Sequence, residues 1–377
     1  MRRRRREQTS SSSVSFVRAR HRATRSIWGP HVAEISRRAG KMVAICRDPL
    51  AFVQLYGRRD AMTFEQEVQA VARQGHDAAV AFVHQRAAEG DADAMMMLAQ
   101  WRCWGHFGSQ DLAEAYRLTE AAAATGHLPA MLTRASMLLT RTGTSRDADA
   151  ARAIVEAAAP RSPLAAQHLA IADSIPREAP QPEILSDDPY IARIPGLISR
   201  DACAFVMARA MPMLQPSFVI DPANGQRVPH PIRTSAGAAF PPTDEDLVLH
   251  TVNCRAATAS NTDVGRGEPL HVLRYTPGQE YRPHLDALPG VENQRSHTVL
   301  IYLNDGYGGG ETEFPELGIT VRAQAGDALV FRNTTDAGRA DARTEHAGLP
   351  VTSGEKWLAT RWIRQAEFHP WKAETER

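Results

Sequence analysis

Two histidines and one aspartate have the side-chain types and spacing that a mononuclear metal site requires. His284 and Asp286 stand two positions apart in residues 281–286, which read as an extended strand. Alternate residues of a strand project from one face, so both side chains can reach one metal ion while Leu285 packs into the interior. His346 follows 60 residues after Asp286 and supplies a third ligand. Two histidines and one carboxylate form the facial triad of non-haem Fe(II) oxygenases, which leaves coordination positions open.

A lysine after the third ligand adds a second kind of group. Lys356 follows His346 by ten residues and begins an otherwise mostly apolar strand. A buried ammonium is costly unless it meets an anion, and the far carboxylate of 2-oxoglutarate would supply one. Taken singly, the lysine could extend to solvent and His346 could be an ordinary loop residue. Their order after the His284 motif, within one β-rich stretch, favours a single site.

The elements that must position these residues are short strands separated by turn-forming residues. Residues 190–198 read as a strand that enters a turn, and Ser199 is a plausible N-cap for a helix that extends to about Met213. The later strands are expected at residues 270–275, 298–303, 312–314, 319–322, 328–331 and 357–364. Many short strands with turns between them predict a closed or double-sheet fold such as a jelly roll.

The preceding part, residues 62–175, reads as helices that repeat at intervals of about 36 residues. Gly90 and the five residues after it reappear as Gly126 and its successors, and small residues recur at matching positions. The glycines are expected at turns between helical hairpins. The pattern resembles short tetratricopeptide-like repeats, which stack into a solenoid and offer a concave surface to a protein or peptide. An alanine-rich bundle with chance self-similarity is the alternative.

Composition marks off two further segments. Residues 1–61 are basic: the first 60 contain 15 Lys or Arg and 4 Asp or Glu. We interpret this extension as a disordered tail or as an incorrectly assigned start that should be Met62, with an organellar transit peptide as the alternative. Residues 176–189 contain four prolines and four acidic residues and predict a stiff, polar linker.

The bulk properties exclude several classes of protein. A length of 377 residues predicts more than one domain, and the chain beyond residue 60 has an excess of acidic residues, so no nucleic acid is expected as a partner. No apolar run is long enough to span a membrane, so no membrane association is expected. The four cysteines are far apart and form no close pair, which favours reduced thiols and a cytoplasmic location; they are Cys46, Cys103, Cys203 and Cys254.

The segment from about residue 190 to residue 364 resembles the catalytic domain of the prolyl 4-hydroxylase family. The matching strings are RTS (233–235), LRYTPGQEY (273–281), PHLD (283–286), GGETEFP (309–315), GDALVF (326–331), RTEHAGLPV (343–351) and GEKW (354–357). This resemblance covers nearly half of the chain. It implies a double-stranded β-helix, Fe(II) and 2-oxoglutarate, O₂ as co-substrate and often ascorbate, with a prolyl residue of a peptide or protein as the substrate.

The resemblance also assigns roles around the metal. Tyr275 corresponds to a tyrosine that hydrogen-bonds the keto acid, and Thr298 and Tyr302 correspond to positions that line the 2-oxoglutarate pocket. The alternative for each is ordinary packing with a satisfied hydroxyl. Three further residues are expected to be structural or at the rim rather than ligands: His271, Tyr281 and His297. Residues 216–242 are expected to form a loop beside the site that orders when substrate binds.

Together these observations predict a multidomain α + β protein. A helical repeat segment is followed by a jelly-roll domain at residues 190–370, with its core at about 266–365. The predicted activity is that of an Fe(II)- and 2-oxoglutarate-dependent dioxygenase, with His284, Asp286 and His346 as catalytic metal ligands. One alternative is an inactive dioxygenase fold that serves a repeat-based interaction module. Another is a metal-dependent hydrolase or cupin-like binder, although such sites have no need of Lys356.

Overall fold

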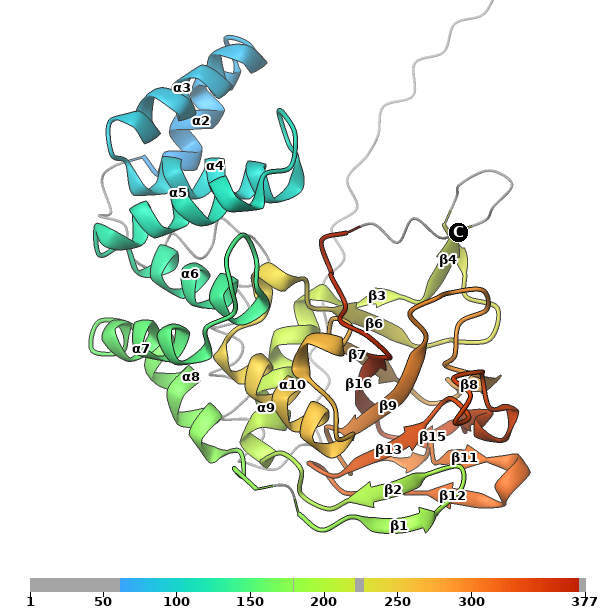
Figure 1. The fold of residues 1–377 in the computed structure, drawn as a ribbon. Helices are drawn as coiled ribbons and strands as arrows, with labels where there is room; N and C mark the ends of the chain where they lie inside the picture. The colour runs from blue at the N-terminus through green and yellow to red at the C-terminus, as the bar shows by residue number, and fades with distance from the viewer. Residues whose placement is uncertain (1–61, 179, 221–226, 373–377) are drawn as a thin grey trace, which may run out of the picture. The chain divides into compact units, whose positions relative to one another are not determined.

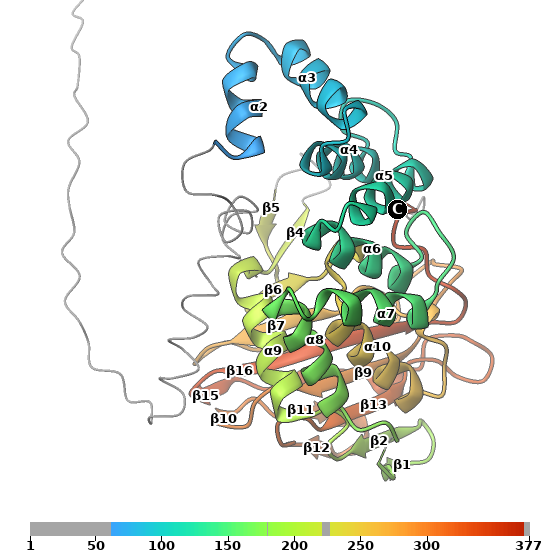
Figure 2. The same cartoon turned by 90° about the vertical axis from the view of Figure 1, so that its left-hand side faces the viewer.

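The alanine- and leucine-rich sequence of the N-terminal part forms a row of short helices. The computed structural model describes residues 62–178, 180–220 and 227–372, so the predictions for residues 1–61 lie outside it. The helices are α2 (Phe64–Ala72), α3 (His76–Ala88), α4 (Ala92–Trp104), α5 (Leu112–Ala124), α6 (Leu128–Thr140), α7 (Ala148–Ala158) and α8 (Pro163–Ser174). Each packs against the next along the chain, which produces the stack seen in Figure 1 and Figure 2.

The predicted repeat is visible in where these helices begin. α4 and α6 start 36 residues apart (92 to 128), as do α5 and α7 (112 to 148). Gly90 and Gly126 precede α4 and α6 with φ of +94° and +82°, which glycine adopts without strain. Asp111 and Asp147 cap α5 and α7, each accepting a 2.9 Å hydrogen bond from the third backbone N–H of its helix. The matching small residues are fully buried, which lets the helices approach closely: Ala94 and Ala130, Ala115 and Ala151, Ala122 and Ala158.

The β-type runs after residue 180 form two main antiparallel sheets. The larger has the order β1 (Glu183–Ser186), β2 (Ile191–Ile194), β13 (Ala328–Arg332), β9 (Arg295–Tyr302), β16 (Lys356–Arg364), β7 (His271–Tyr275), β6 (Ala236–Ala239) and β3 (Gln215–Pro216). The smaller has the order β12 (Ile319–Val321), β11 (Thr312–Phe314), β14 (His346–Gly348) and β8 (Tyr281–His284). Two short pairs complete the fold: β10 (Gly308–Gly309) with β15 (Val351–Ser353), and β4 (Phe218–Ile220) with β5 (Arg227–Pro229). This double-sheet arrangement is the predicted jelly roll.

Alternation along the central strands gives the large sheet two different faces. One face packs toward the small sheet, with Tyr302 and Leu358 against Phe314. The other face carries Val299 and Ala359. It is covered by helices α9 (Arg200–Ala210) and α10 (Leu247–Ala259), as Figure 1 shows. Successive residues of one strand therefore serve two separate cores.

The helical stack and the β-rich part share a hydrophobic core. Leu139 and Val155 of the stack pack with Phe205 of α9 and Val248 of α10. Within the same interface, the buried Ser136 hydroxyl donates to the backbone carbonyl of Glu245 at 2.8 Å. The stack is thus joined to the β-rich part through buried contacts rather than through a linker alone.

Several elements differ from the expectations. Strands β4, β5 and β6 lie within residues 216–242, which were expected to form a loop, and β6 pairs with β7 in the large sheet. Strand β1 lies inside the stretch that was predicted to be linker, where it pairs with β2 at the edge of the large sheet. Helix α10 was not predicted, because the helix is buried on several sides and its sequence lacks a clear apolar stripe. The helix at residue 200 begins as expected, with the Ser199 hydroxyl accepting a hydrogen bond from the Ala202 N–H at 3.1 Å. Among the described residues, no helix combines the length and the apolar character that a membrane span requires.

Candidate metal centre

The three predicted ligands meet on the small sheet, where two short strands pair. β8 ends at His284 and β14 begins at His346, and the antiparallel register places these residues directly opposite each other. Asp286 lies beyond the end of β8, so its carboxylate enters the site from a bend rather than from the strand itself. Its two oxygens are each 3.7 Å from an imidazole Nε2 atom, that of His284 and that of His346. All three ligand atoms lie within 4.8 Å of one another.

Hydrogen bonds determine which imidazole nitrogens face the site. Nδ1 of His284 lies 2.9 Å from the backbone carbonyl of Arg282, and Nδ1 of His346 lies 3.1 Å from that of Thr344. Each Nδ1 therefore donates its proton to a carbonyl, which leaves the Nε2 lone pair free for a metal. Burial and the neighbouring His346 lower the pKa of His284 to about 4, so its ring is neutral at pH 7.

The Asp286 carboxylate is held by a chain of buried hydrogen bonds. The Thr298 hydroxyl donates to Asp286 Oδ2 at 2.7 Å, and the Asn333 amide donates to Thr298 Oγ1 at 2.9 Å. Burial opposes ionisation of Asp286, but the two imidazoles, Arg295 and the Thr298 hydrogen bond together lower its pKa. The site thus offers two imidazole nitrogens and an oriented carboxylate, a donor set that fits Fe(II).

A buried ion-pair cluster supports the backbone of the same bend. Nε and Nη2 of Arg295 donate to the two carboxylate oxygens of Glu268 at 2.6 and 2.7 Å. The remaining Nη1 of Arg295 donates to the Asp286 carbonyl at 3.4 Å. Arg364 also pairs with Glu268, at 2.7 Å. The bidentate contact with Glu268 fixes the Arg295 guanidinium. The guanidinium in turn holds the backbone at Asp286 in place.

Lys356 lines the same cavity as the triad, a space of about 30 Å³. Its side chain is buried, and its ammonium donates to the Gly310 carbonyl at 2.7 Å. Gly310 has a φ of +70°, and a Cβ there would lie 3.2 Å from the lysine Cδ, so this close approach requires glycine. Burial lowers the pKa of Lys356 to about 8. Glu311, whose charge partly opposes this, is itself paired with Arg322 at 3.0 Å.

The other predicted site residues divide into two groups. Tyr275 lines the cavity, and its ring centre is 5.7 Å from the Lys356 ammonium. Tyr302 lies outside the lining, and its hydroxyl is hydrogen-bonded to Thr312, which does line the cavity, at 2.8 Å. Thr298 is also outside the lining, because its hydroxyl is used by Asp286. The Thr298 hydroxyl therefore supports the metal ligand, and a role of this residue in the keto-acid pocket stays a prediction.

The prediction that Leu285 packs into the interior is wrong. Its side chain is 37% exposed, because the chain leaves the strand after His284 and the alternation of faces ends there. Tyr281 lies beside the site as a rim residue, with its ring stacked on that of His284 at a centroid distance of 3.5 Å. His271 and His297 stay outside the group of ligands.

Sequence reasoning missed the residues that hold the ligands in place. These residues are Glu268, Arg295, Asn333 and Arg364, and none of them was singled out from the sequence. Arg364 does carry a signal, since it lies at the end of the predicted strand 357–364, where a buried charge needs a partner. The partner that it shares with Arg295 could not be identified from spacing, because Glu268 belongs to a different segment of the chain.

Comparison with known proteins finds a family model and a curated relative that resemble part of the chain. The family model described as the 2OG-Fe(II) oxygenase superfamily matches residues 270–364. Prolyl 4-hydroxylase 1 of Arabidopsis thaliana is 36% identical over 204 residues, which are 49% of this chain and 72% of that protein.

Two solved structures are each similar to part of the chain. The viral collagen prolyl hydroxylase of Paramecium Bursaria Chlorella virus-1, in its 2-oxoglutarate complex, has a TM-score of 0.40 and 28% identity, and the match covers 48% of this chain and 99% of that one. A Sel1 repeat protein of Oxalobacter formigenes has a TM-score of 0.26 and 18% identity, with coverage of 37% and 97%.

Proposed function

Because this chain belongs to the prolyl 4-hydroxylase family of Fe(II)- and 2-oxoglutarate-dependent oxygenases, we propose that it hydroxylates a prolyl residue within a peptide or protein. Prolyl hydroxylases act on peptide substrates. The observation that carries the proposal is the convergence of His284, Asp286 and His346, with both Nε2 atoms directed at one carboxylate. A buried lysine in the same cavity adds the group that a dicarboxylic co-substrate needs.

The polar side chains that would hold the iron and the co-substrate then have defined tasks. His284, Asp286 and His346 would hold the iron, and Lys356 would pair with the far carboxylate of 2-oxoglutarate. When bound, Fe(II), 2-oxoglutarate and O₂ supply the oxidising chemistry: one oxygen atom enters a substrate C–H bond as hydroxyl, and the other enters succinate with loss of CO₂. Ascorbate as reductant stays a prediction.

The electrostatics of the cavity suit a dianionic co-substrate. The Lys356 ammonium has no full ion pair and keeps only the Gly310 carbonyl as a close partner among the described residues. A carboxylate beside it would stabilise the protonated form, so the pKa of the lysine would rise as the co-substrate binds. The buried walls exclude water from this contact and strengthen it.

The rim of the site has features that suit a peptide. Leu285 is exposed beside the metal ligands, and Tyr281 stacks on His284. The guanidinium of Arg233 lies 5.3 Å from the centre of the Tyr281 ring. Arg233 belongs to the stretch that was predicted to form a loop beside the site, and the β4–β5 hairpin precedes it. We expect a proline-containing peptide to pass over these apolar and aromatic groups.

The test is turnover of peptides by anaerobically purified, Fe(II)-loaded protein. Proline-rich peptides and poly(L-proline) are supplied with 2-oxoglutarate and ascorbate, and air is admitted at time zero. Succinate is measured together with oxygen incorporation into the peptide by mass spectrometry. The matched controls are the same peptides with alanine in place of proline, and the double variant His284→Ala, Asp286→Ala.

The expected result is succinate formation coupled to a hydroxyproline product, both of which the double variant lacks. Oxygen incorporation at another residue type in the alanine peptides would refute the prolyl assignment while preserving the dioxygenase. No succinate from any peptide, and no keto-acid-to-iron absorption band on anaerobic mixing, would refute the catalytic role.

A further inference from the structure

A second cavity lies against the opposite face of strand β16. It has a volume of about 40 Å³ and is enclosed by parts of the chain that are far apart in sequence. The α6–α7 connection contributes Arg146, the region where α10 begins contributes Glu245 and His250, and β16 contributes Arg361. The cavity that Lys356 and the three metal ligands line is called the iron cavity. The residues of β16 that line it have even numbers, such as Lys356 and Thr360. Arg361 has an odd number and therefore points to the opposite face of the strand.

Arg361 is a buried cation with unused hydrogen-bond donors. Only 4% of the residue is exposed, and its Nη2 donates to the Val264 carbonyl at 3.3 Å. Its Nε and Nη1 have no hydrogen-bond partner among the residues that the structure describes. A buried guanidinium in this state is unfavourable unless water or an anion occupies the adjoining space.

Arg146 presents a second guanidinium to the same cavity. Its Nε donates to the Leu139 carbonyl at 3.2 Å, a bond that stabilises the turn after α6. The nearest carboxylate oxygen to Nη1 is that of Asp263, at 3.9 Å, and the Asp263 side chain is 70% exposed. A pair at that distance and exposure screens the guanidinium only weakly. The terminal nitrogens of Arg146 are therefore also available to a ligand.

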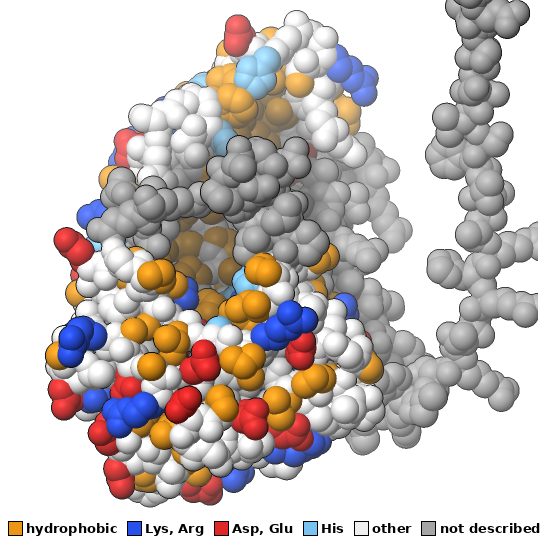
Figure 3. All heavy atoms as spheres, turned by 90° about the vertical axis from the view of Figure 1, so that its right-hand side faces the viewer, with side chains coloured by type: hydrophobic (Ala, Val, Ile, Leu, Met, Phe, Trp, Pro, Cys, Tyr) orange, Lys and Arg blue, Asp and Glu red, His pale blue; other side chains and the backbone are white. Residues whose placement is uncertain are grey.

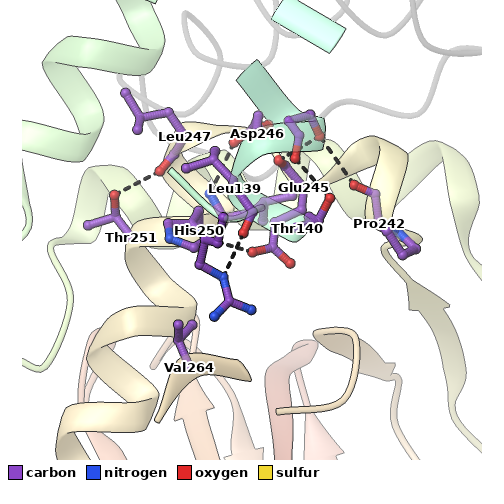
Figure 4. Close-up of polar contacts among 12 residues, drawn as sticks. Leu139, Thr140, Pro242, Glu245, Asp246, Leu247, His250, Thr251 and Val264 are labelled. Carbon is purple, nitrogen blue, oxygen red and sulfur yellow. Dashed lines mark hydrogen bonds and ion pairs between the residues drawn. The ribbon is translucent and has the colours of Figure 1, made fainter. Parts of the chain in front are cut away.

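The remaining charged groups of the cavity neutralise each other. His250 Nδ1 lies 2.8 Å from Glu245 Oε1, a contact that Figure 4 shows. Burial lowers the pKa of His250, but hydrogen bonds to Cys254 and Glu245 outweigh that effect and raise the pKa to about 9. The imidazolium and the carboxylate thus cancel at neutral pH, and the two arginines leave the cavity with a net positive charge.

Two glycines make room for the guanidinium groups. A Cβ at Gly267 would lie 2.1 Å from Arg361 Nε, and a Cβ at Gly265 would lie 3.1 Å from Arg146 Nη1. Any other residue at position 267 would displace the arginine from the cavity wall. The space that remains holds roughly three water molecules, or one small tetrahedral anion.

We propose that this cavity binds a small oxyanion with the size and charge of inorganic phosphate, held between the guanidinium groups of Arg146 and Arg361. Arginine suits this role because its planar donors match the oxygens of such an anion. The bound anion would join the helical stack to strand β16, because one arginine comes from each. The site is separate from the iron cavity and does not depend on the proposed prolyl hydroxylation.

The experiment measures binding of inorganic phosphate to the metal-free, full-length protein. Equilibrium dialysis with labelled phosphate is performed at constant ionic strength, with sodium chloride as the balancing salt. We expect one saturable site in the wild type. The variant Arg146→Gln removes one charge-assisted contact and should weaken binding by roughly tenfold or more. Arg361→Met should abolish binding, with its fold checked by circular dichroism.

Two control variants make the outcome decisive. Arg152→Gln changes an exposed arginine of α7 that pairs with Glu156 and Asp173, so phosphate binding should be unchanged. Lys356→Met removes the cation of the iron cavity, and phosphate binding should be unchanged in this variant too. If Lys356→Met abolishes phosphate binding and Arg146→Gln preserves it, the anion occupies the 2-oxoglutarate pocket and the proposal is overturned. Absence of saturable binding in the wild type would show that the cavity holds only water, which also overturns it.

Discussion

Strand β16 carries three buried cations, and two of them, Lys356 and Arg361, lie on opposite faces and differ in one chemical property. Lys356 faces the iron cavity and Arg361 faces the second cavity, and each donates to a single backbone carbonyl at 2.7 and 3.3 Å. Burial lowers the pKa of Lys356 to about 8, so at pH 7 its neutral form costs only about 1.4 kcal/mol. A guanidinium stays charged under the same conditions.

The titratable lysine and the permanently charged arginine suit cavities that hold their ligands in different ways. A pocket whose co-substrate enters and leaves in every turnover benefits from a cation that can become neutral when the pocket empties. A pocket walled by arginine stays positive when empty, so it must be filled by water or by an anion that stays. We therefore interpret the lysine face as a site that exchanges its ligand in every turnover, and the arginine face as a site whose anion does not need to leave during turnover.

The largest expected effect is on kcat/KM for 2-oxoglutarate, which should depend on Lys356 on one face of β16 and not on Arg361 on the other. Lys356→Met removes the charge-assisted contact to 2-oxoglutarate and should lower kcat/KM for this co-substrate by roughly 100- to 1000-fold. Arg361→Met should change the same parameter by less than about threefold, since that side chain is outside the cavity. Succinate formation is measured against 2-oxoglutarate concentration for both variants. Equal losses in the two variants would contradict the division into two faces.

The second-largest effect concerns the stability of the protein and tests Arg364, a buried cation that is paired with a carboxylate. Arg364 is also on β16, and it shares the Glu268 carboxylate with Arg295. Glu268→Gln should lower the free energy of unfolding by about 3 kcal/mol, because two buried guanidinium groups lose their counter-ion. Urea unfolding measures this, with Glu114→Gln as the surface control, where the change should be within about 0.5 kcal/mol. If the free energy of unfolding changed by a similarly small amount in Glu268→Gln and in Glu114→Gln, the buried ion-pair cluster would have to be hydrated.

A smaller effect concerns the support of the metal ligand. Thr298→Val keeps the shape of the side chain but removes the hydrogen bond to Asp286. Iron affinity should fall by roughly 10- to 100-fold, as is typical when a group that orients a metal ligand is lost. Competition of Fe(II) against a chelator measures the affinity. Thr320→Val on the exposed side of β12 is the control, and an equal loss there would remove the specific role of Thr298.

The smallest effect is a pH dependence confined to the lysine face. The ammonium of Lys356 binds the co-substrate, and its pKa of about 8 lies below the ordinary value, so protonated lysine predominates only below that pH. Affinity for 2-oxoglutarate should thus fall as pH rises through 8, by up to about tenfold per pH unit. Lys356→Arg should bind with a flat profile over the same range, since arginine does not titrate there. A wild-type profile as flat as that of the variant would contradict the assignment.

About half of the described strands, including the longest ones, were predicted from the sequence, because their residue types and turns are local signals. The expected strand at 312–314 coincides with β11, and that at 357–364 differs from β16 only by the inclusion of Lys356. The triad was also predictable, because His284 and Asp286 are only two positions apart and the third ligand lies in a string that matches the family.

What could not be predicted depends on pairings between distant segments. The place of Asp286 beyond its strand end follows from the bend after β8, which no local residue signals. The roles of Thr298 and Glu268 depend on which side chains the folded sheets bring together. Leu285 was misassigned for the same reason, since strand alternation was assumed to continue past His284.

The facing pair His284 and His346 has a consequence for how the protein acquires metal. The two residues are 62 positions apart (284 to 346), and β8 and β14 contain only four and three residues. A chain that has not yet closed this sheet offers iron a two-ligand chelate at most, and closing so long a loop has an entropic cost. Iron that binds the complete triad stabilises the closed sheet by mass action. Only molecules in which this sheet has closed bind iron through all three ligands. A sample that is purified with its metal is therefore enriched in correctly folded protein.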